Sequence, residues 1–478
     1  MSDFFSRYTE LGEGYLVPQQ PQQFEQAQLL LINADLLAEL AMDVDQQQLR
    51  DYLAGVSKVD DIEPVAMAYC GHQFGHFNPQ LGDGRAHLIA SFTTAQGHTY
   101  DMHLKGSGAT VFSRGGDGLC ALGPAVREYI MSHAMRALGV PTTQCLAVLS
   151  TNQQVMRQER EPGAVVCRIA RSHIRVGTFQ LMAMKKDVDA MQQLVELCIA
   201  DQFNDISSNG EQRVFDFFER VCLRQCALIL KWMQVGFIHG VMNTDNTLIN
   251  GETIDYGPCA MMESFSFDAV FSSIDRQGRY AFGQQPNIAS WNCGRLAESL
   301  MLLVDDKDAA LERFSGILSQ FAEEFNQGYQ QMWSNKLGLL SWQGSDQTLL
   351  SELLSLMQQN QLDYTNTFAA LTNSLQPTPL PSYVIPEALA DWTGKWRKRI
   401  GDGNLSAAHA IMQSANPAII PRNGMVEHFI GEFNLAKHSD EFTQWLNALK
   451  TPYLYQAYPA QWLASMTNEK TYQTFCGT

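Results

Sequence analysis

The chain has 478 residues, of which 45% are apolar, and its formal net charge is −17. This length predicts two or more packed units with a sizeable core. The acidic surface argues against broad contact with nucleic acid or with membranes, and we find no apolar stretch long enough to span a bilayer. Residues 1–13 lack the basic and apolar regions of a secretory signal, and the ten cysteines form no C-x-x-C pair. We therefore expect a protein of the reducing cytoplasm.

The first part of the chain, from about residue 40 to 170, is expected to be rich in strands and glycine turns. Strands are predicted at 86–92 and 98–105, joined by the turn TTAQG. A loop with six glycines follows at 106–123. A helix is predicted at 124–138, because proline suits the first turn of a helix and the glycine that follows suits its end.

The second part, from about Asp187, has the pattern of helices. Residues 214–235 form a long, mostly apolar run that ends before a glycine and predict a buried helix. Two short segments, 247–250 and 253–256, flank an Asn-Gly pair, which predicts a β-hairpin. The chain from about 296 to the end is expected to be mostly helical, with a break at a proline cluster near its middle.

This order of elements predicts an α+β fold with two lobes joined near residues 170–186. We expect an N-terminal region and strand-rich lobe at 1–170, a helical lobe at 171–300 and a helical C-terminal extension at 301–478. Nucleotide sites favour the cleft between two such lobes.

A compact polar segment carries the first candidate for chemistry. HGVMNTDN, residues 239–246, precedes Asp255-Tyr256-Gly257. A protein-kinase catalytic loop has the pattern H-R-D-x-x-x-x-N and is followed by D-F-G. Asn246 and Asp255 stand at the matching positions, and an amide oxygen with a carboxylate suits Mg²⁺. The alternative is a polar loop that only caps a helix.

The catalytic aspartate of a kinase would fall at Val241, which cannot accept a proton. The nearest carboxylate of the segment belongs to Asp245, beside Asn246. Two interpretations remain open at this point: phosphoryl transfer is lost, or the chemistry proceeds through Asp245.

Upstream residues complete the pattern of a kinase small lobe. Gly82 and Gly84 form a turn before a strand, and glycine turns allow backbone N–H groups to approach phosphate. Lys105 ends the next strand, and the following helix carries Glu128. A kinase-like lobe would place Lys105 between phosphate and Glu128. A common turn and a solvated lysine are the alternatives.

Two arginines, Arg168 and Arg175, lie close to the expected junction of the lobes. Arginine binds phosphate through two parallel N–H bonds, so this pair suggests an anion pocket. Asp117 and Gly118 of the glycine-rich loop could turn toward the same cleft. The alternatives are surface salt bridges for the arginines and a flexible loop for the Asp-Gly pair.

Several long motifs resemble one known family. The segment MAYCGHQFGHFNPQLGDGR at 67–85, KGSG at 105–108, REY at 127–129, HGVMNTDN at 239–246 and IDYGP at 254–258 are similar to the selenoprotein-O family, whose bacterial members are called YdiU proteins. The resemblance extends over most of the chain, from about Phe5 to the end.

The resemblance implies a protein-kinase-like fold that transfers AMP from ATP to Ser, Thr or Tyr of other proteins, with ATP bound in a flipped orientation. Bacterial members are also described as UMP transferases that use Mn²⁺, so Mg²⁺ or Mn²⁺ and ATP or UTP are implied. It assigns the proton acceptor to Asp245 and the metal to Asn246 and Asp255. The nucleotide-binding residues that it implies are Gly82, Gly84, Arg85, Lys105, Asp117, Gly118, Arg168 and Arg175.

The family also suggests a redox role for its C-terminal cysteine, here Cys476. The resemblance predicts a partner cysteine near Ser272 or Ser273, where this chain has serine. Cys259 and Cys293 are possible substitutes. A zinc site at Cys70, His72 and His76 is not expected, because no second ligand cluster completes a tetrahedral set.

Cys222 and Cys226 share one face of the expected helix and are assigned to the core. Two other functions stay open beside protein nucleotidyl transfer. One is a pseudokinase scaffold that binds nucleotide without turnover, and the other is a phosphotransferase acting on a small molecule.

Overall fold

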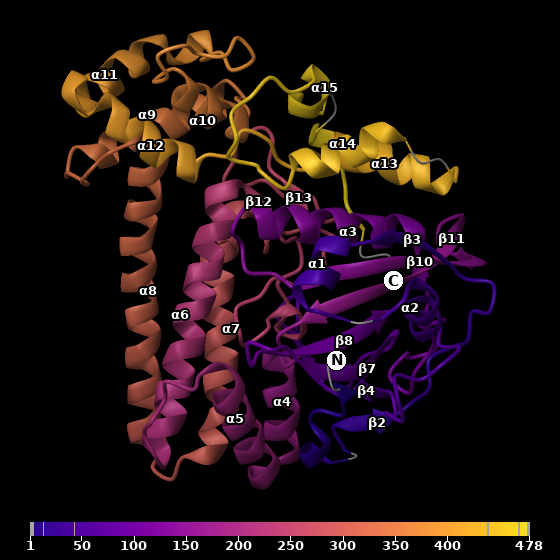
Figure 1. The fold of residues 1–478 in the computed structure, drawn as a ribbon. Helices are drawn as coiled ribbons and strands as arrows, with labels where there is room; N and C mark the ends of the chain where they lie inside the picture. Colours follow the sequence, from indigo (N-terminus) through magenta and orange to yellow (C-terminus); the bar gives the residue numbers. More distant parts are fainter. Residues whose placement is uncertain (1–3, 13, 43, 437–438, 467–468, 476–478) are drawn as a thin grey trace.

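The computed structural model describes residues 4–12, 14–42, 44–436, 439–466 and 469–475. It has an α+β architecture in which a strand-rich part packs beside a group of long helices, and a set of shorter helices covers one end of both (Figure 1). The expected change from strands to helices is confirmed, because the last strand of the large sheet ends at Ala170 and helix α4 begins at Val176.

The strand-rich part is built on an antiparallel sheet of nine strands within the described residues, with the central order β2-β4-β7-β8-β11-β10-β3. β1 pairs with β7, and β9 pairs with β11. The strands are β1 (Phe4–Phe5), β2 (Leu16–Pro18), β3 (Gln28–Ile32), β4 (Val65–Met67), β7 (Ala86–Thr93), β8 (Thr99–Lys105), β9 (Cys120–Ala121), β10 (Gln144–Met156) and β11 (Arg160–Ala170). Both strands predicted at 86–105 are therefore confirmed.

The two faces of this sheet pack against different cores, as the alternation of side chains along a strand requires. Val165, Cys167 and Ile169 of β11 belong to a cluster shared with α1 (Ala34–Glu39) and α2 (Gln46–Leu53). Val166 belongs to the main cluster, which includes α3 and the helical part. Arg168 follows Val166 by two residues and so projects from the same face, toward α3.

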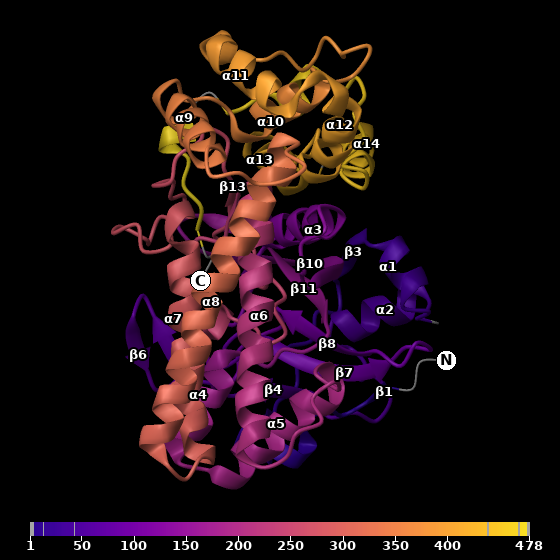
Figure 2. The same cartoon turned by 90° about the vertical axis from the view of Figure 1, so that its left-hand side faces the viewer.

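Helix α3 (Leu122–Ala137) packs on β10 and β11 and confirms the helix predicted from the proline. The helical part contains α4 (Val176–Lys185), α5 (Val188–Gln202), α6 (Glu211–Val235), α7 (Gln285–Leu300) and α8 (Lys307–Leu337). Helix α6 confirms the long apolar helix, and Cys222 and Cys226 lie buried on it as expected. Figure 2 shows α6, α7 and α8 running side by side.

The C-terminal helices lie over one end of the molecule. They are α9 (Asp346–Gln359), α10 (Tyr364–Asn373), α11 (Ala390–Ile400), α12 (Leu405–Ala415), α13 (Asn423–Asn434), α14 (Asp440–Ala448) and α15 (Ala460–Leu463). The proline cluster interrupts them between α10 and α11, as predicted. Helix α13 packs on α3, where Arg127 pairs with Glu427 and donates a hydrogen bond to the Tyr472 hydroxyl oxygen at 2.7 Å.

The hairpin predicted at 247–256 is wrong. A turn forms one residue earlier than expected, around Ile249-Asn250, since Gly251 N–H donates to Leu248 O. Leu248 bridges to Arg175 and Thr253 bridges to Thr142, so the two segments pair with other parts of the chain. An Asn-Gly pair favours a turn but does not fix the pairing of the segments that flank it.

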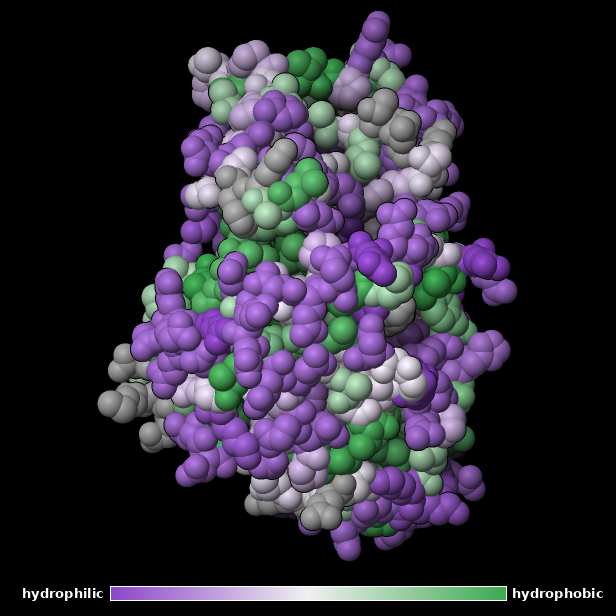
Figure 3. Space-filling model, turned by 90° about the vertical axis from the view of Figure 1, so that its right-hand side faces the viewer, coloured by the Kyte–Doolittle hydropathy of each residue, from purple (hydrophilic) through white to green (hydrophobic). Residues whose placement is uncertain are grey.

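Hydrophilic side chains cover most of the face shown in Figure 3, and hydrophobic ones are scattered in small groups. Within the described residues, no helix combines the length and the apolar character needed to cross a membrane. The nine cysteines of the described part are all buried and free. Cys476 lies outside the described residues.

Candidate active site

A cleft of about 580 Å³ lies between the sheet and the loops of the helical part. Its lining runs from Tyr69 to Ile274 in the chain and includes the turn before β7 and the segment after α6. The sequence-predicted residues that line it are Gly82, Gly84, Arg85, Lys105, Asp117, Gly118, Arg168, Arg175, Asp245, Asn246 and Asp255. Glu128 lies behind Lys105, outside this lining.

Four charged side chains form a buried network at the back of the cleft. Lys105 Nζ lies 2.9 Å from Glu128 Oε2 and 2.6 Å from Asp255 Oδ1. Arg168 Nη2 lies 2.6 Å from Glu128 Oε1 and 3.9 Å from Asp255. The pair of Lys105 with Glu128 that the sequence predicted is therefore present. Arg168 is buried in the same network rather than in a surface salt bridge.

This network fixes the charge of its carboxyl groups. Burial alone would raise the pKa of Asp255, but the charges of Lys105, Arg168 and Arg85 lower it below its ordinary value. The pKa of Glu128 is lowered in the same way, against the effect of its burial, by Arg168 and Lys105. Both groups are anions at neutral pH, so the back of the cleft holds two cations and two anions.

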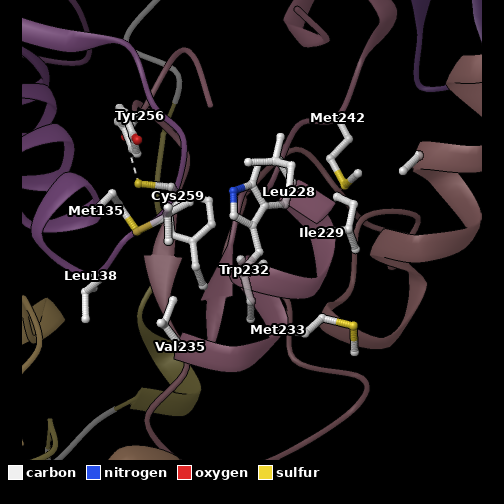
Figure 4. Packing of buried hydrophobic residues seen from close by; sticks show 14 of the residues in the cluster. Met135, Leu138, Leu228, Ile229, Trp232, Met233, Val235, Met242, Tyr256 and Cys259 are labelled. Atoms are coloured by element: carbon white, nitrogen blue, oxygen red, sulfur yellow. Dashed lines mark hydrogen bonds between the residues drawn. The ribbon is translucent and has the colours of Figure 1, made fainter. Parts of the chain in front are cut away.

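Buried side chains of the helical part support the segment that carries Asp245. His239 Nε2 donates to Ile254 O at 2.8 Å, and the imidazole stacks on Trp232 with 5.3 Å between ring centroids. Trp232 Nε1 in turn donates to Thr253 Oγ1 at 2.9 Å. Figure 4 shows Trp232 among buried side chains, with Met242 on one side and Cys259 on the other. These contacts position the two loops that end in Asn246 and Asp255.

Asp245 has one engaged and one free carboxylate oxygen. Gln73 Nε2 donates to its Oδ2 at 3.2 Å, whereas its buried Oδ1 has no hydrogen-bond partner among the described residues. Burial raises the pKa of Asp245, and the nearby Arg175 opposes this shift only in part. A carboxylate with a raised pKa and a free oxygen in a cleft is suited to accept a proton.

Arg175 is available to bind an anion, because its ion pair with Asp83 is long. Its Nη1 donates to Asp245 O at 3.1 Å, and its guanidinium lies over the Tyr69 ring at 4.3 Å. Its buried Nη2 has no hydrogen-bond partner among the described residues and lies 3.7 Å from Asp83 Oδ1. Asp83 accepts shorter bonds from other groups, including His103 Nε2 at 3.0 Å.

The residues expected to hold a metal ion fit that role. Asn246 Nδ2 donates to Val241 O at 3.1 Å, which leaves the amide oxygen of Asn246 available as a ligand. Asp255 supplies a carboxylate that stays ionised. The described residues contain no cluster of three or more His, Cys, Asp or Glu side chains suited to a metal. Two oxygen ligands agree with Mg²⁺ or Mn²⁺ sites that are completed by water and phosphate oxygens.

The glycine turn at the mouth of the cleft has a structural reason that the sequence did not reveal. A Cβ atom on Gly82, whose φ is +136°, would collide with the Phe112 ring. A Cβ on Gly84 would lie 2.8 Å from Phe112 O. The glycines therefore allow the loop before Asp117 to close over the turn. Asp117 itself forms an ion pair with Arg157 at 2.8 Å at the rim of the cleft.

The comparisons with known proteins agree with these motifs. A family model described as protein adenylyltransferase SelO matches residues 1–450. The chain belongs to the SelO family. A protein nucleotidyltransferase YdiU of Pseudoalteromonas translucida (strain TAC 125) is 48% identical over 473 residues, which cover 99% of each chain. Proteins with the same description from Teredinibacter turnerae and Anoxybacillus flavithermus are 43% and 41% identical, over 98% and 100% of this chain and 99% of their own. The resemblance drawn from the motifs is thereby confirmed.

Sequence patterns gave no indication of the hairpin that supports the segment of Asp245 in this SelO-family chain. The hairpin consists of β5 (Gly71–Gln73) and β6 (His76–Asn78). Besides the bond from Gln73 to Asp245, Phe74 N–H donates to Asn243 Oδ1 at 3.1 Å, and the Tyr280 hydroxyl donates to the same oxygen at 2.7 Å. Gln73 and Phe74 lie inside a recognised motif, but their partners Asp245 and Asn243 are 172 and 169 positions away, so sequence spacing gave no signal.

Proposed function

We propose that this chain binds a nucleoside triphosphate and a divalent cation between two kinase-like lobes and transfers the nucleoside monophosphate to a protein hydroxyl. The observation that carries this proposal is Asp245. It places a carboxylate with a free oxygen in the cleft, although Val241 occupies the position of the kinase base. Membership of the SelO family supports protein adenylylation, and the description of the relatives as protein nucleotidyltransferases leaves room for UMP.

The cations of the cleft would bind the phosphates. Lys105 and Arg168 occupy its back, and Arg175 extends an unsatisfied Nη2 beside Asp245. The resemblance implies that the triphosphate lies flipped, with its distal phosphates among these groups and its α-phosphate facing Asp245. Guanidinium and ammonium groups placed there stabilise the charge that develops on departing pyrophosphate.

The transfer itself would proceed by displacement at the α-phosphorus. The acceptor hydroxyl oxygen forms the new P–O bond, its proton passes to the free Oδ1 of Asp245, and the bond between the α-phosphorus and the bridging oxygen breaks. Pyrophosphate leaves with that bridging oxygen. Gln73 keeps Oδ2 of Asp245 occupied, so that Oδ1 faces the acceptor.

Asn246 and Asp255 would hold the divalent cation. When bound, the cation neutralises charge on the phosphate oxygens and orients them. Asp255 also anchors Lys105, so it serves the cation and the phosphate-binding lysine together. A cytoplasmic location is part of the proposal and is supported by the nine buried, free cysteines.

The proposal is tested with ATP or UTP labelled at the α-phosphate, incubated with the protein, a mixture of acceptor proteins and Mg²⁺ or Mn²⁺. Protein-bound label that is absent with γ-labelled nucleotide and absent for Asp255→Ala and Asp245→Asn would establish nucleotidyl transfer and its nucleotide. Nucleotide binding without any label would favour the scaffold instead. Transfer from the γ-position would favour a phosphotransferase.

A further inference from the structure

The hairpin β5–β6 stands clear of the sheet beside α4 and α7 (Figure 2). At its base, Gly71 packs so closely on the catalytic segment that an added Cβ would lie 2.5 Å from Thr244 Oγ1. On the opposite strand, Phe77, which pairs with His72, is 45% exposed. One strand of the hairpin therefore contacts the segment of Asp245, and the other presents Phe77 to the solvent from which an acceptor protein would approach.

A tryptophan of α7 supports the outer side of this hairpin. The ring of His72 lies 5.2 Å from that of Trp291 and 5.1 Å from that of Phe77. Two guanidinium groups lie against the same indole, that of Arg279 at 4.8 Å and that of Arg295 at 4.9 Å from the ring centroid. We refer to Arg279, Trp291 and Arg295 as the arginine–tryptophan cluster.

The two arginines of the arginine–tryptophan cluster have few carboxylate partners. Arg295 pairs with Glu298 at 2.6 Å, but the described residues place no carboxylate within ion-pair distance of the Arg279 guanidinium. Its buried Nε has no hydrogen-bond partner among them either. Asp275, the acidic side chain next to Arg279 in the fold, accepts the backbone N–H groups of Arg279 and Tyr280 at 2.9 and 2.8 Å.

The Arg279 guanidinium thus lies without a carboxylate partner among the described residues, in a protein whose net charge is −17. Stacking on an aromatic ring orients a guanidinium and leaves its edge free for a planar carboxylate. Arg279 is also tied to the reaction centre, because the next residue, Tyr280, donates to Asn243 of the catalytic segment. The cluster is thus held in a fixed relation to Asp245.

We propose that the arginine–tryptophan cluster is a subsite that binds an aspartate or glutamate side chain of the acceptor protein, close to the hydroxyl that is modified. This inference rests on the proposed function and specifies its substrate class as hydroxyls in acidic sequence. The carboxylate would accept bonds from Arg279, with Arg295 adding long-range attraction.

The test measures binding and transfer separately. Three fluorescent peptides share a central tyrosine that is flanked by glutamate, glutamine or lysine, and their binding is followed by anisotropy without nucleotide. The acidic peptide should bind about tenfold or more tightly than the others, as expected for a charge-assisted bond. This preference should weaken in high salt. Arg279→Gln should abolish it, Arg279→Lys should retain part of it, and the double change Arg279→Glu with Arg295→Glu should invert it.

The matched control is Arg313→Gln on α8, because the Arg313 guanidinium also lies over an aromatic ring, that of Phe215 at 4.4 Å, but far along the chain from the hairpin. It should leave the preference unchanged. Equal binding of the three peptides, no detectable binding of the acidic one, or a preference that survives the double change would overturn the subsite.

Labelling of the same peptides with α-labelled nucleotide separates the two proposals. Selective binding of the acidic peptide without any transfer would refute the proposed function and leave the subsite standing. Equal labelling rates for the acidic and lysine peptides would refute the subsite and leave the function standing.

Discussion

Replacing Glu128 by glutamine should destabilise the protein far more than the loss of a surface carboxylate. Glu128 is 1% exposed and contacts both Lys105 and Arg168. In the wild type these two cations face two carboxylates. In the Glu128→Gln variant they would share Asp255 alone, 2.6 Å from Lys105 and 3.9 Å from Arg168, and one buried positive charge would remain uncompensated.

The expected loss in the free energy of unfolding follows from this uncompensated positive charge. Removing one partner of a buried ion pair lowers the free energy of unfolding by about 3–5 kcal/mol, because the remaining charge stays desolvated. A comparable exposed pair is that of Glu196 with Arg213, in which the glutamate side chain is 43% exposed. Its removal should change the free energy of unfolding by less than about 1 kcal/mol.

The measurement compares urea unfolding of wild type, Glu128→Gln and Glu196→Gln, followed by tryptophan fluorescence. The first variant should unfold at a clearly lower urea concentration than the other two proteins, with a similar slope. Unfolding of Glu128→Gln and Glu196→Gln at the same urea concentration would show that Glu128 does not compensate a buried positive charge.

Three further predictions concern the cleft and its surroundings. Gln73→Leu removes the bond to Asp245 and should lower the transfer rate about tenfold with an unchanged KM for nucleotide; an unaltered rate in steady-state kinetics would contradict this. Asn246→Ala should raise the Mn²⁺ concentration for half-maximal transfer about tenfold or more, as measured by titration after chelation, and an identical titration curve would count against its role as a ligand. Burial raises the pKa of Glu252 to about 7, above an unfolded value of about 4.3. Wild-type stability should therefore fall as the pH rises between these values, by on the order of 3 kcal/mol. Glu252→Gln should not show this fall in thermal unfolding at pH 5 and 8, and parallel behaviour of the two proteins would refute the assignment.

The sequence predicted those parts of the site that depend on local order. Lys105 at a strand end and Glu128 on the next helix could be paired because a familiar succession of elements lies between them. Asn246 and Asp255 were placed together from the kinase motif and from a hairpin expected between them, and both line the cleft although that hairpin is absent. Its segments bridge to Arg175 and Thr142 instead, and pairing between distant segments is decided by the packed structure rather than by the turn.

The features that sequence reasoning missed all depend on contacts between distant residues. Gln73 reaches Asp245 across 172 positions, and Gly82 is required by the close approach of the Phe112 ring. Arg168 and Arg175 were correctly placed at the cleft. Arg168 pairs with Glu128 at 2.6 Å, whereas Arg175 lies 3.7 Å from Asp83. This difference depends on how each guanidinium is buried and oriented, which cannot be read from the sequence.

The attachment of α3 links the C-terminal helices to the cleft. Its outer face packs on α13, through the pairing of Arg127 with Glu427 and the bond to Tyr472, while Glu128 at the next position pairs with Lys105. Any movement of α3 away from Lys105 would therefore also break its contacts with α13 and Tyr472. The C-terminal helices thus stabilise an ion pair inside the cleft, although none of their described residues lines it.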